Sequence, residues 1–484
     1  MTGLPDFCLT FPCTMNDISA MNNEATRAFI RLHRNDDVRR LALKGSGQGG
    51  SHPATVDMPF ALDQIAGWQM ARTKLPTYAA TDGIVFPPHL NMEQCSSEAT
   101  ARYKARIAER HQAPLLIDLT GGFGIDFSFL APCFAHAVYV ERNERLCAIA
   151  RHNFGCLGLA NTEVVCGDGE DYLHQLRAQV DSGSTQPSSA THSRSALSSI
   201  RPFIFIDPAR RDANGHKVFG IADCTPDVLS LKDELMAAAS CVMIKLSPML
   251  DWHAAARAFA PYCREVHIVS VGNECKELLL VLSPEPLATP LTSSDESRAS
   301  AIRLVCANDA EIFEQPVSFD LTSSFAPEPI VAPAEVDRAT AVISEPFSAD
   351  EVVGASLCVP NASIMKAGIF MALTRKFGVR AVDRDSHLFL GQQKVNGFPG
   401  RQFRIMGLTT MNKRELRNRL AGITKANIAV RNFPLSADAL RKRLKLKDGG
   451  SCYLFATTMQ GRHVIFITQP WKTAAADGVY YENS

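Results

Sequence analysis

A glycine-rich turn after a short apolar run constrains this chain more than any other feature. Residues 118–126 read Asp-Leu-Thr-Gly-Gly-Phe-Gly-Ile-Asp and follow the apolar residues 115–117. Because glycine has no Cβ, such a turn lets backbone N–H groups at the start of a helix approach a polar ligand closely. Glu141 ends the next apolar run, at the place where an acid can accept hydrogen bonds from ribose hydroxyls. The pattern predicts a nucleoside-cofactor site.

Apolar runs alternate with helix-length segments through the middle of the chain. The runs cover residues 115–117, 137–140, 163–166, 203–206, 241–246, 266–271 and 278–283. This alternation predicts an α/β fold with a doubly wound, mostly parallel sheet. Two inserts rich in Ser and Thr, at about 181–199 and at 284–300, interrupt it and are expected to be mobile surface loops.

The remaining segments suggest further domains. Apolar residues at helical spacing predict a helical region before the first strand, and serines after Gln94 offer a helix cap. Beyond the middle part, strand-like runs at 356–359 and 388–390 flank one expected helix over 364–377. The expected parts are a helical region at 1–110, a cofactor domain at 111–285, a small α+β domain with linkers at 286–400 and a separate unit at 401–484.

Composition excludes several classes of protein. The chain has 484 residues with 50 basic and 50 acidic side chains, so net charge alone indicates no partner. Its 14 cysteines form no Cys-x-x-Cys pair, which predicts reduced thiols, no metal site and a cytoplasmic location. We expect no membrane span, because no apolar stretch approaches the length that a spanning helix needs.

The strand ends distinguish a methyl donor from a nicotinamide cofactor. Asp118 stands where a nicotinamide motif has its first glycine, and an acid there suits the ammonium of S-adenosylmethionine better than a pyrophosphate. Thr120, Gly122 and Gly124 form the loop, and Asp168 ends the third run, where such enzymes bind the adenine amino group. We therefore predict S-adenosylmethionine as the cofactor, with Glu141 at its ribose.

The fourth run ends in Asp207-Pro208-Ala209-Arg210, which predicts the place of reaction. The Asp207 carboxylate and the Pro208 carbonyl can hydrogen-bond an amino group and orient its lone pair toward the methyl group. Arg210 stands where amino-methylating enzymes usually have an aromatic residue; it can stack on a base or hold a phosphate. A surface salt bridge is the other interpretation of Arg210.

The turn after the fifth run favours nitrogen over carbon as the methyl acceptor. Asp-Pro-Ala-Arg also resembles a motif of RNA uracil-C5 methyltransferases, which need a cysteine nucleophile after the fifth strand. Here that turn reads Lys-Leu-Ser-Pro-Met from Lys245 and contains no cysteine. Lys245 is a candidate contact to the substrate at the strand tip.

Several of these motifs together resemble one bacterial family. The chain is similar to class I methyltransferases with a THUMP-like C-terminal domain in residues 94–98, 118–124, 205–211 and 431–435. The resemblance implies a Rossmann-like class I methyltransferase sheet followed by ferredoxin-like and THUMP-like domains. It also implies that the segment with Gln94 and Ser96 lies against the methionine end of the cofactor.

Basic residues are concentrated near the C-terminus. Between Arg401 and Lys447 there are 13 Lys or Arg residues and 2 acids. Such segregation is typical of a surface that binds a polyanion, and RNA is the natural partner for a methyltransferase of this kind. The alternative is a solvated basic face. The candidate RNA contacts on two expected helices are Arg417, Arg419, Arg441, Lys442 and Arg443.

These features predict an S-adenosylmethionine-dependent methyltransferase that acts on a base nitrogen of tRNA or rRNA. Two alternatives stay open. The enzyme could act on a protein or small molecule, with the basic tail serving for localisation, or it could have lost catalysis and retain only binding of RNA and cofactor. The sequence leaves the methylated atom, the oligomeric state and the role of residues 301–400 open.

Overall fold

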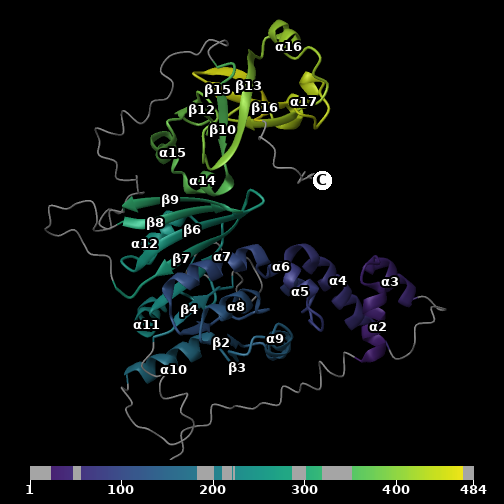
Figure 1. Cartoon of the computed structure of the whole chain (residues 1–484), viewed down its shortest axis with the longest axis vertical. Coiled ribbons are helices and arrows are strands. Elements are labelled where there is room, and N and C mark those ends of the chain that lie inside the picture. The colour runs from purple at the N-terminus through teal and green to yellow at the C-terminus, as the bar shows by residue number, and fades with distance from the viewer. Residues whose placement is uncertain are drawn as a thin grey trace, which may run out of the picture. The chain divides into compact units, whose positions relative to one another are not determined.

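The computed structural model describes residues 23–46, 56–181, 201–209, 221, 224–285, 301–318 and 352–471. The chain divides into two compact units (Figure 1). The first comprises Met1–Val271 and Lys276–Ile302, and the second comprises Gly272–Cys275 and Arg303–Ser484. Almost all of the two expected loops, at 181–199 and 284–300, lies outside the described residues.

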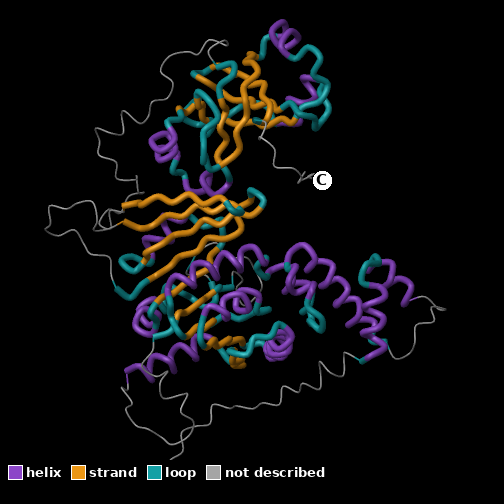
Figure 2. Tube along the Cα trace, in the orientation of Figure 1, coloured by secondary structure: helices purple, strands orange, loops and turns teal. Residues whose placement is uncertain are grey.

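The first unit begins with helices, as expected (Figure 2). They are α2 (Glu24–His33), α3 (Val38–Ser46), α4 (Met58–Lys74), α5 (Pro76–Ala80), α6 (His89–Gln94), α7 (Glu98–Ala108) and the 3-10 turn η1 (Glu109–His111). Side-chain oxygens cap three of them: Asn23 for α2, Asp57 for α4 and Ser97 for α7. The cap at Ser97 confirms the helix start that the serines near Gln94 predict.

The first unit continues with strands that alternate with helices. These elements are β1 (Leu115–Asp118), α8 (Ile125–Leu130), η2 (Ala131–Cys133), β2 (His136–Glu141), α9 (Glu144–Cys156), β3 (Thr162–Cys166), α10 (Gly169–Asp181), β4 (Phe203–Ile206), α11 (Lys232–Ala238), β5 (Cys241–Leu246), α12 (Trp252–Ala258), β6 (Cys263–Val271) and β7 (Glu274–Leu282). Every residue of β1 and β4 is buried. Strands covered on both faces need such unbroken apolar runs, which confirms the expected parallel α/β sheet.

The strand order brings the functional ends together. The strands of this unit run in the order β3-β2-β1-β4-β5-β7-β6. The first five are parallel, and β7 pairs with β5 in the antiparallel direction, with Leu246 opposite Leu278. The carboxyl ends of β1, β2, β3, β4 and β5 therefore share one edge with the beginning of β7.

The second unit is an α+β structure. Its elements are β8 (Ala301–Asn308), β9 (Glu311–Ser318), β10 (Ser356–Pro360), α14 (Ala362–Ala367), α15 (Phe370–Phe377), β11 (Arg380–Ala381), β12 (Phe389–Gly391), β13 (Gly400–Thr410), α16 (Lys413–Arg419), β14 (Asn427–Arg431), α17 (Ala437–Leu444), β15 (Tyr453–Met459) and β16 (Arg462–Pro470). One sheet has the order β11-β12-β10-β13-β16-β15-β14. The expected boundary at residues 400 and 401 falls at the start of β13, which pairs with β10 on one side and β16 on the other.

One expected helix is two. The pattern over 364–377 predicts a single helix, whereas α14 ends at Ala367 and α15 begins at Phe370. Gly368 takes a left-handed conformation with φ 71°, and its N–H donates to the carbonyl of Ile364. A glycine in this conformation ends a helix, so the prediction of one continuous helix was wrong.

The two basic helices lie against the large sheet of this unit. Leu440 of α17 is fully buried in a cluster with sheet residues, and Leu416 of α16 packs against that cluster. The opposite sides of both helices are left for the basic side chains. No helix in the described ranges combines the length and apolar character needed to cross a bilayer.

Candidate active site

The loop after β1 is held by its own first residue. Asp118 is buried, with 1% exposure, and its Oδ1 accepts the N–H of Thr120 at 2.9 Å. The N–H of Gly121 donates to the carbonyl of Val140 at 2.9 Å, which ties the loop to β2. The loop is therefore ordered by the carboxylate that the sequence assigns to the cofactor.

Two glycines of this loop are required by space. A Cβ on Gly121 would lie 2.2 Å from the ring of Tyr139, which is closer than any non-bonded carbon contact allows. Gly124 has φ 83°, and a Cβ there would also lie 2.9 Å from the ring of Phe154. The close approach of the loop to these two rings explains why glycine stands at both positions.

Glu141, at the end of β2, braces the same loop. Its Oε2 accepts the N–H of Gly122 at 2.8 Å, and its Oε1 accepts the N–H of Asn143 at 2.8 Å. A carboxylate has about four lone-pair positions, so these two bonds leave room for ribose hydroxyls. Asp168, after β3, is exposed, and its Oδ1 accepts the N–H of Glu170 at 2.8 Å.

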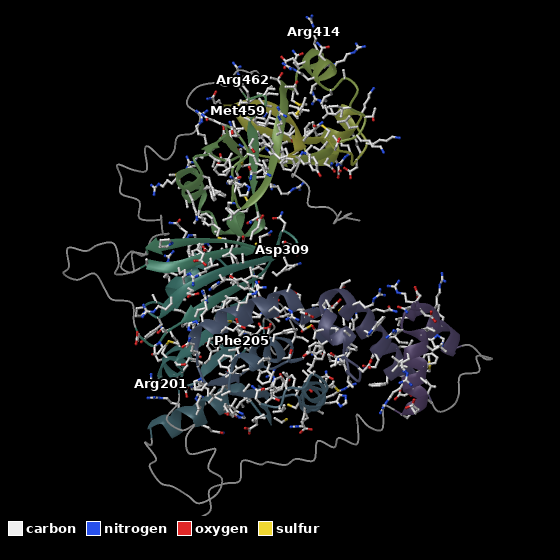
Figure 3. The ribbon with its side chains drawn as sticks, viewed as in Figure 1. Arg201, Phe205, Asp309, Arg414, Met459 and Arg462 are labelled. Carbon is white, nitrogen blue, oxygen red and sulfur yellow. The ribbon has the colours of Figure 1, made fainter. Side chains whose placement is uncertain are left out.

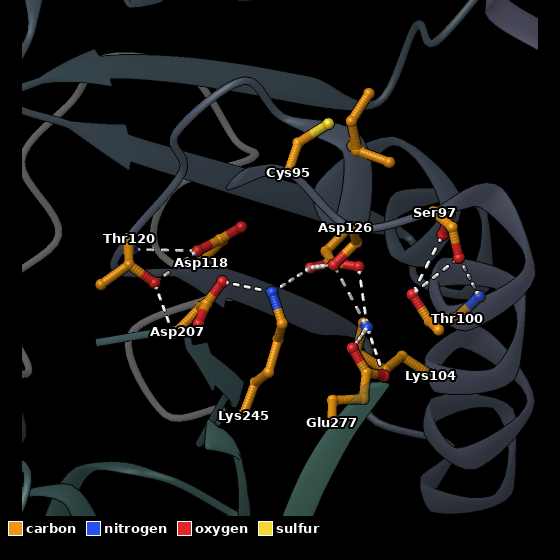
Figure 4. Close-up of polar contacts among 12 residues, drawn as sticks. Cys95, Ser97, Thr100, Lys104, Asp118, Thr120, Asp126, Asp207, Lys245 and Glu277 are labelled. Atoms are coloured by element: carbon orange, nitrogen blue, oxygen red, sulfur yellow. Dashed lines mark hydrogen bonds and ion pairs between the residues drawn. The ribbon is translucent and has the colours of Figure 1, made fainter. Parts of the chain in front are cut away.

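Asp207 follows β4 directly beside the loop. Its N–H donates to Oγ1 of Thr120 at 2.6 Å, and its Oδ2 lies 2.6 Å from Nζ of Lys245 (Figure 4). The side chain of Asp207 is 36% exposed, whereas Pro208 is buried. The structure thus brings two predicted site residues, Thr120 and Asp207, into direct contact. Arg210, the third catalytic candidate, lies outside the described residues.

Lys245 is more enclosed than a solvated lysine at a strand tip. Its side chain is 13% exposed and forms ion pairs with Asp207 at 2.6 Å and with Asp126 at 3.7 Å. Burial by itself lowers the pKa of Lys245, but the carboxylates of Asp207 and Asp126 outweigh burial, so the pKa lies above its ordinary value. Lys245 is therefore a fixed positive charge within the site.

Three charged residues that the sequence interpretation missed complete this region. Nζ of Lys104, on α7, lies 2.6 Å from Oε1 of Glu277 on β7 and 3.1 Å from Oδ1 of Asp126 on α8. The exposed fractions of these side chains are 0% for Lys104, 3% for Glu277 and 10% for Asp126. The available signal was a charge on the otherwise buried faces of α7, α8 and β7, which sequence periodicity alone does not pair.

The two aspartates at the start of the site differ in charge. Burial raises the pKa of Asp118 well above its ordinary value. Burial also acts to raise the pKa of Asp126, but Lys104 and Lys245 outweigh it and lower that pKa below its ordinary value. Asp118 is thus poised to gain stability from an added cation, whereas Asp126 already has two.

The segment before α7 reaches this region through one serine. Oγ of Ser96 is buried and donates to Oδ2 of Asp126 at 2.7 Å. Gln94 is exposed at the end of α6. The expected cofactor role of both residues stays a prediction.

The basic residues of the second unit lie on its surface. Of the 13 Lys and Arg residues between Arg401 and Lys447, 12 are exposed, including Arg417, Arg419, Lys442 and Arg443. Figure 3 shows the side chain of Arg414 projecting outward from α16. Arg441 is the exception, because its guanidinium pairs with Asp438 and with Asp448, each at 2.7 Å. We therefore expect Arg441 to brace α17 more than it contacts a ligand.

Comparisons with known proteins agree with this architecture. A THUMP domain-like family model matches residues 400–470, and a ferredoxin-like domain model matches residues 357–399. A crystal structure of a "putative methyltransferase" from Porphyromonas gingivalis W83 is 28% identical, with a TM-score of 0.69, and the match covers 93% of this chain and 98% of that one.

Two proteins of Mycobacterium tuberculosis, from strains CDC 1551 / Oshkosh and ATCC 25618 / H37Rv, are similar in sequence. Both are named "uncharacterized S-adenosylmethionine-dependent methyltransferase". Each is 22% identical over 358 residues, which are 74% of this chain and 80% of the relative.

The strand order and these matches define a class of protein. The sheet has the class I methyltransferase arrangement, and ferredoxin-like and THUMP-like modules follow it toward the C-terminus. The predicted fold and the resemblance to this class are confirmed.

Proposed function

We propose that this protein is an S-adenosylmethionine-dependent methyltransferase that methylates a base nitrogen of RNA. The observation that carries the proposal is the contact between the glycine loop and Asp207, made by Oγ1 of Thr120 at 2.6 Å. It places an acceptor carboxylate beside the loop where the cofactor is expected. The names of the similar proteins support the cofactor, and the THUMP-like match supports RNA.

The residues of the site fit the cofactor. Asp118 is a buried carboxylate with a raised pKa, and the ammonium of the methionine part would compensate its charge. Glu141 keeps acceptor capacity for ribose hydroxyls beyond its two backbone bonds. S-adenosylmethionine, when bound, supplies a methyl group on a sulfonium that retains the electron pair of the broken C–S bond.

Asp207 would orient the nitrogen that receives the methyl group. One of its carboxylate oxygens pairs with Lys245, and the other can accept an N–H of the substrate, as can the carbonyl of Pro208. The nitrogen lone pair forms the N–C bond, and the nitrogen then loses one proton to the Asp207 carboxylate or to water. The exposed basic residues on α16 and α17 would hold the RNA by its phosphates.

The direct test is methyl transfer from labelled S-adenosylmethionine to total RNA from cells that lack this protein. Wild type would be compared with Asp207→Ala and with Glu163→Ala, an exposed acid on β3, as the control. We expect wild type and the control to form one new nucleoside with the methyl group on nitrogen, and Asp207→Ala to form none. Methylation at carbon would contradict the assigned acceptor atom.

The same assay separates the alternatives. Transfer to the protein or small-molecule fraction, with none to RNA, would favour the other substrate classes. Binding of S-adenosylmethionine without transfer to any fraction would favour a protein that has lost catalysis. We also propose the domain limits of 1–110, 111–285, 286–400 and 401–484; a cytoplasmic location stays a prediction.

A further inference from the structure

Five charged side chains form one continuous row in the first unit. In order they are Glu277, Lys104, Asp126, Lys245 and Asp207, which we call the ion-pair chain; the separations between charged atoms are 2.6, 3.1, 3.7 and 2.6 Å. Negative and positive groups alternate along it (Figure 4). It begins on β7, crosses α7 and α8, and ends at the residue that follows β4.

The ion-pair chain opens to solvent at one end. The exposed fractions are 3% for Glu277, 0% for Lys104, 10% for Asp126, 13% for Lys245 and 36% for Asp207. Asp207 is therefore the member that a substrate can reach, and the other members stand behind it.

Such an arrangement is a poor device for stability alone. Removing five charges from water is costly, and well-packed apolar side chains in place of a buried ion pair often stabilise a protein equally well or better. Buried charges with shifted pKa values are concentrated at functional sites, where they orient reacting groups. The position of the open end, at Asp207 beside the glycine loop, indicates what is oriented.

We propose that Asp126 is a positioning residue that fixes Asp207 through Lys245, and that Lys104 and Glu277 hold Asp126 in place. This inference rests on the proposed methyltransferase function. Lys245 would occupy Oδ2 of Asp207 and leave Oδ1 directed at the substrate amino group. Because Lys245 also faces Asp126, its ammonium cannot follow Asp207 freely toward solvent.

Two further bonds make the arrangement rigid. Ser96 donates to Oδ2 of Asp126 at 2.7 Å, which fixes the carboxylate that faces Lys245. Thr120 accepts the backbone N–H of Asp207 at 2.6 Å, which fixes the same residue from the side of the cofactor loop. Asp207 is thus held at its backbone by the loop and at its side chain by the ion-pair chain.

The first test measures position without any substrate. Lysines of the intact protein are labelled by reductive methylation with formaldehyde and a borane, and the extent at Lys245 and Lys104 is read by mass spectrometry. We expect Lys245 to react several-fold faster in Asp126→Asn than in wild type, while Lys104, still paired with Glu277, stays protected. The exposed change Glu163→Gln is the control for loss of one negative charge. Equal protection of Lys245 in wild type and in Asp126→Asn would overturn the proposal.

The second test uses the methyl-transfer assay. Asp126→Asn is expected to lower kcat by about tenfold to a hundredfold, the scale of a small misplacement of a reacting group, with KM for S-adenosylmethionine nearly unchanged. Lys245→Met should lower kcat similarly, Lys245→Arg should restore part of it, and the double variant Asp126→Asn/Lys245→Met should be no worse than the poorer single variant. A multiplicative loss in the double variant would show that the two residues act independently.

Lys104 is tested together with its partner. Lys104→Met alone leaves Glu277 buried without a cation, so we use Lys104→Met/Glu277→Leu, which removes both charges. This variant should fold and show a lowered kcat. If wild type transfers no methyl group to any substrate, the proposed function fails while the labelling result still decides the role of Asp126; a normal kcat in Asp126→Asn would refute the positioning role alone.

Discussion

The hydroxyl of Thr120 accepts the backbone N–H of Asp207 at 2.6 Å, across 87 positions of sequence. This bond joins the loop after β1 to the residue that follows β4. A change in the loop is therefore transmitted to Asp207 over a single side chain.

Replacement of Thr120 tests that bond. Thr120→Val keeps the shape but removes the acceptor, so the N–H of Asp207 loses its partner at a cost of about 1–3 kcal/mol. We expect a lower midpoint of thermal unfolding and about tenfold slower methyl transfer, because Asp207 is no longer held toward the loop. Thr120→Ser retains the hydroxyl and should behave like wild type; equal loss in both variants would contradict the role of the hydroxyl.

The raised pKa of Asp118 predicts proton release when the cofactor binds. In the free protein burial keeps this carboxyl protonated well above its ordinary range, whereas the ionised form binds an ammonium. Affinity should therefore rise with pH until Asp118 is ionised in the free protein as well. Calorimetry of S-adenosylmethionine binding in buffers of different ionisation enthalpy measures the protons released; zero release would be incompatible with this assignment.

Asp118→Asn should separate stability from binding. A carboxyl whose folded pKa is raised loses stability as pH rises above its unfolded pKa of about 3.9, and that loss is complete once pH exceeds the folded pKa. The amide has no such penalty, so the free variant should be more stable than wild type near neutral pH. Cofactor affinity should fall by about tenfold to a hundredfold, since a hydrogen bond to a charged group contributes roughly 1.5–3 kcal/mol. A variant that is both less stable and unchanged in affinity would argue against both expectations.

Two glycines in different surroundings give a matched pair of alanine variants. In Gly121→Ala the new Cβ would lie 2.2 Å from the ring of Tyr139, so the loop or the ring must move, at a cost of about 1–3 kcal/mol and with weaker cofactor binding. Gly155, on α9, has open space within 4 Å of the position that a Cβ would take. Gly155→Ala should thus be neutral or stabilise the protein by up to about 1 kcal/mol. Denaturant unfolding and calorimetric binding distinguish the two.

Salt dependence tests the basic surface of the second unit. The double variant Lys442→Gln/Arg443→Gln removes two exposed cations and should weaken RNA binding and reduce the slope of log affinity against log salt by about 1.5. Arg441→Gln should change that slope less, because its guanidinium is engaged by Asp438 and Asp448. Filter binding across a salt series measures both, and a larger effect of Arg441→Gln would reverse the assignment.

Local patterns were enough to predict the sheet and the polar residues at its strand ends. Apolar runs, the glycine turn and the acids that follow β1, β2 and β4 are each specified by a few neighbouring residues, so Asp118, Glu141 and Asp207 could be singled out from sequence. The split between α14 and α15 was missed, although Gly368 was its local signal. Helical periodicity continues through a single glycine, and only the left-handed backbone there ends the helix.

The sequence by itself determined which residues stand at the ends of the strands, because a strand, its turn and the following acid are contiguous. The tertiary structure alone decided which charges meet. Lys104 and Glu277 are 173 positions apart, and nothing in their neighbourhoods specifies the partner. The antiparallel course of β7 brings Glu277 to the edge where β1, β4 and β5 end. The resulting burial makes a row of ordinary acids and lysines into the support of Asp207.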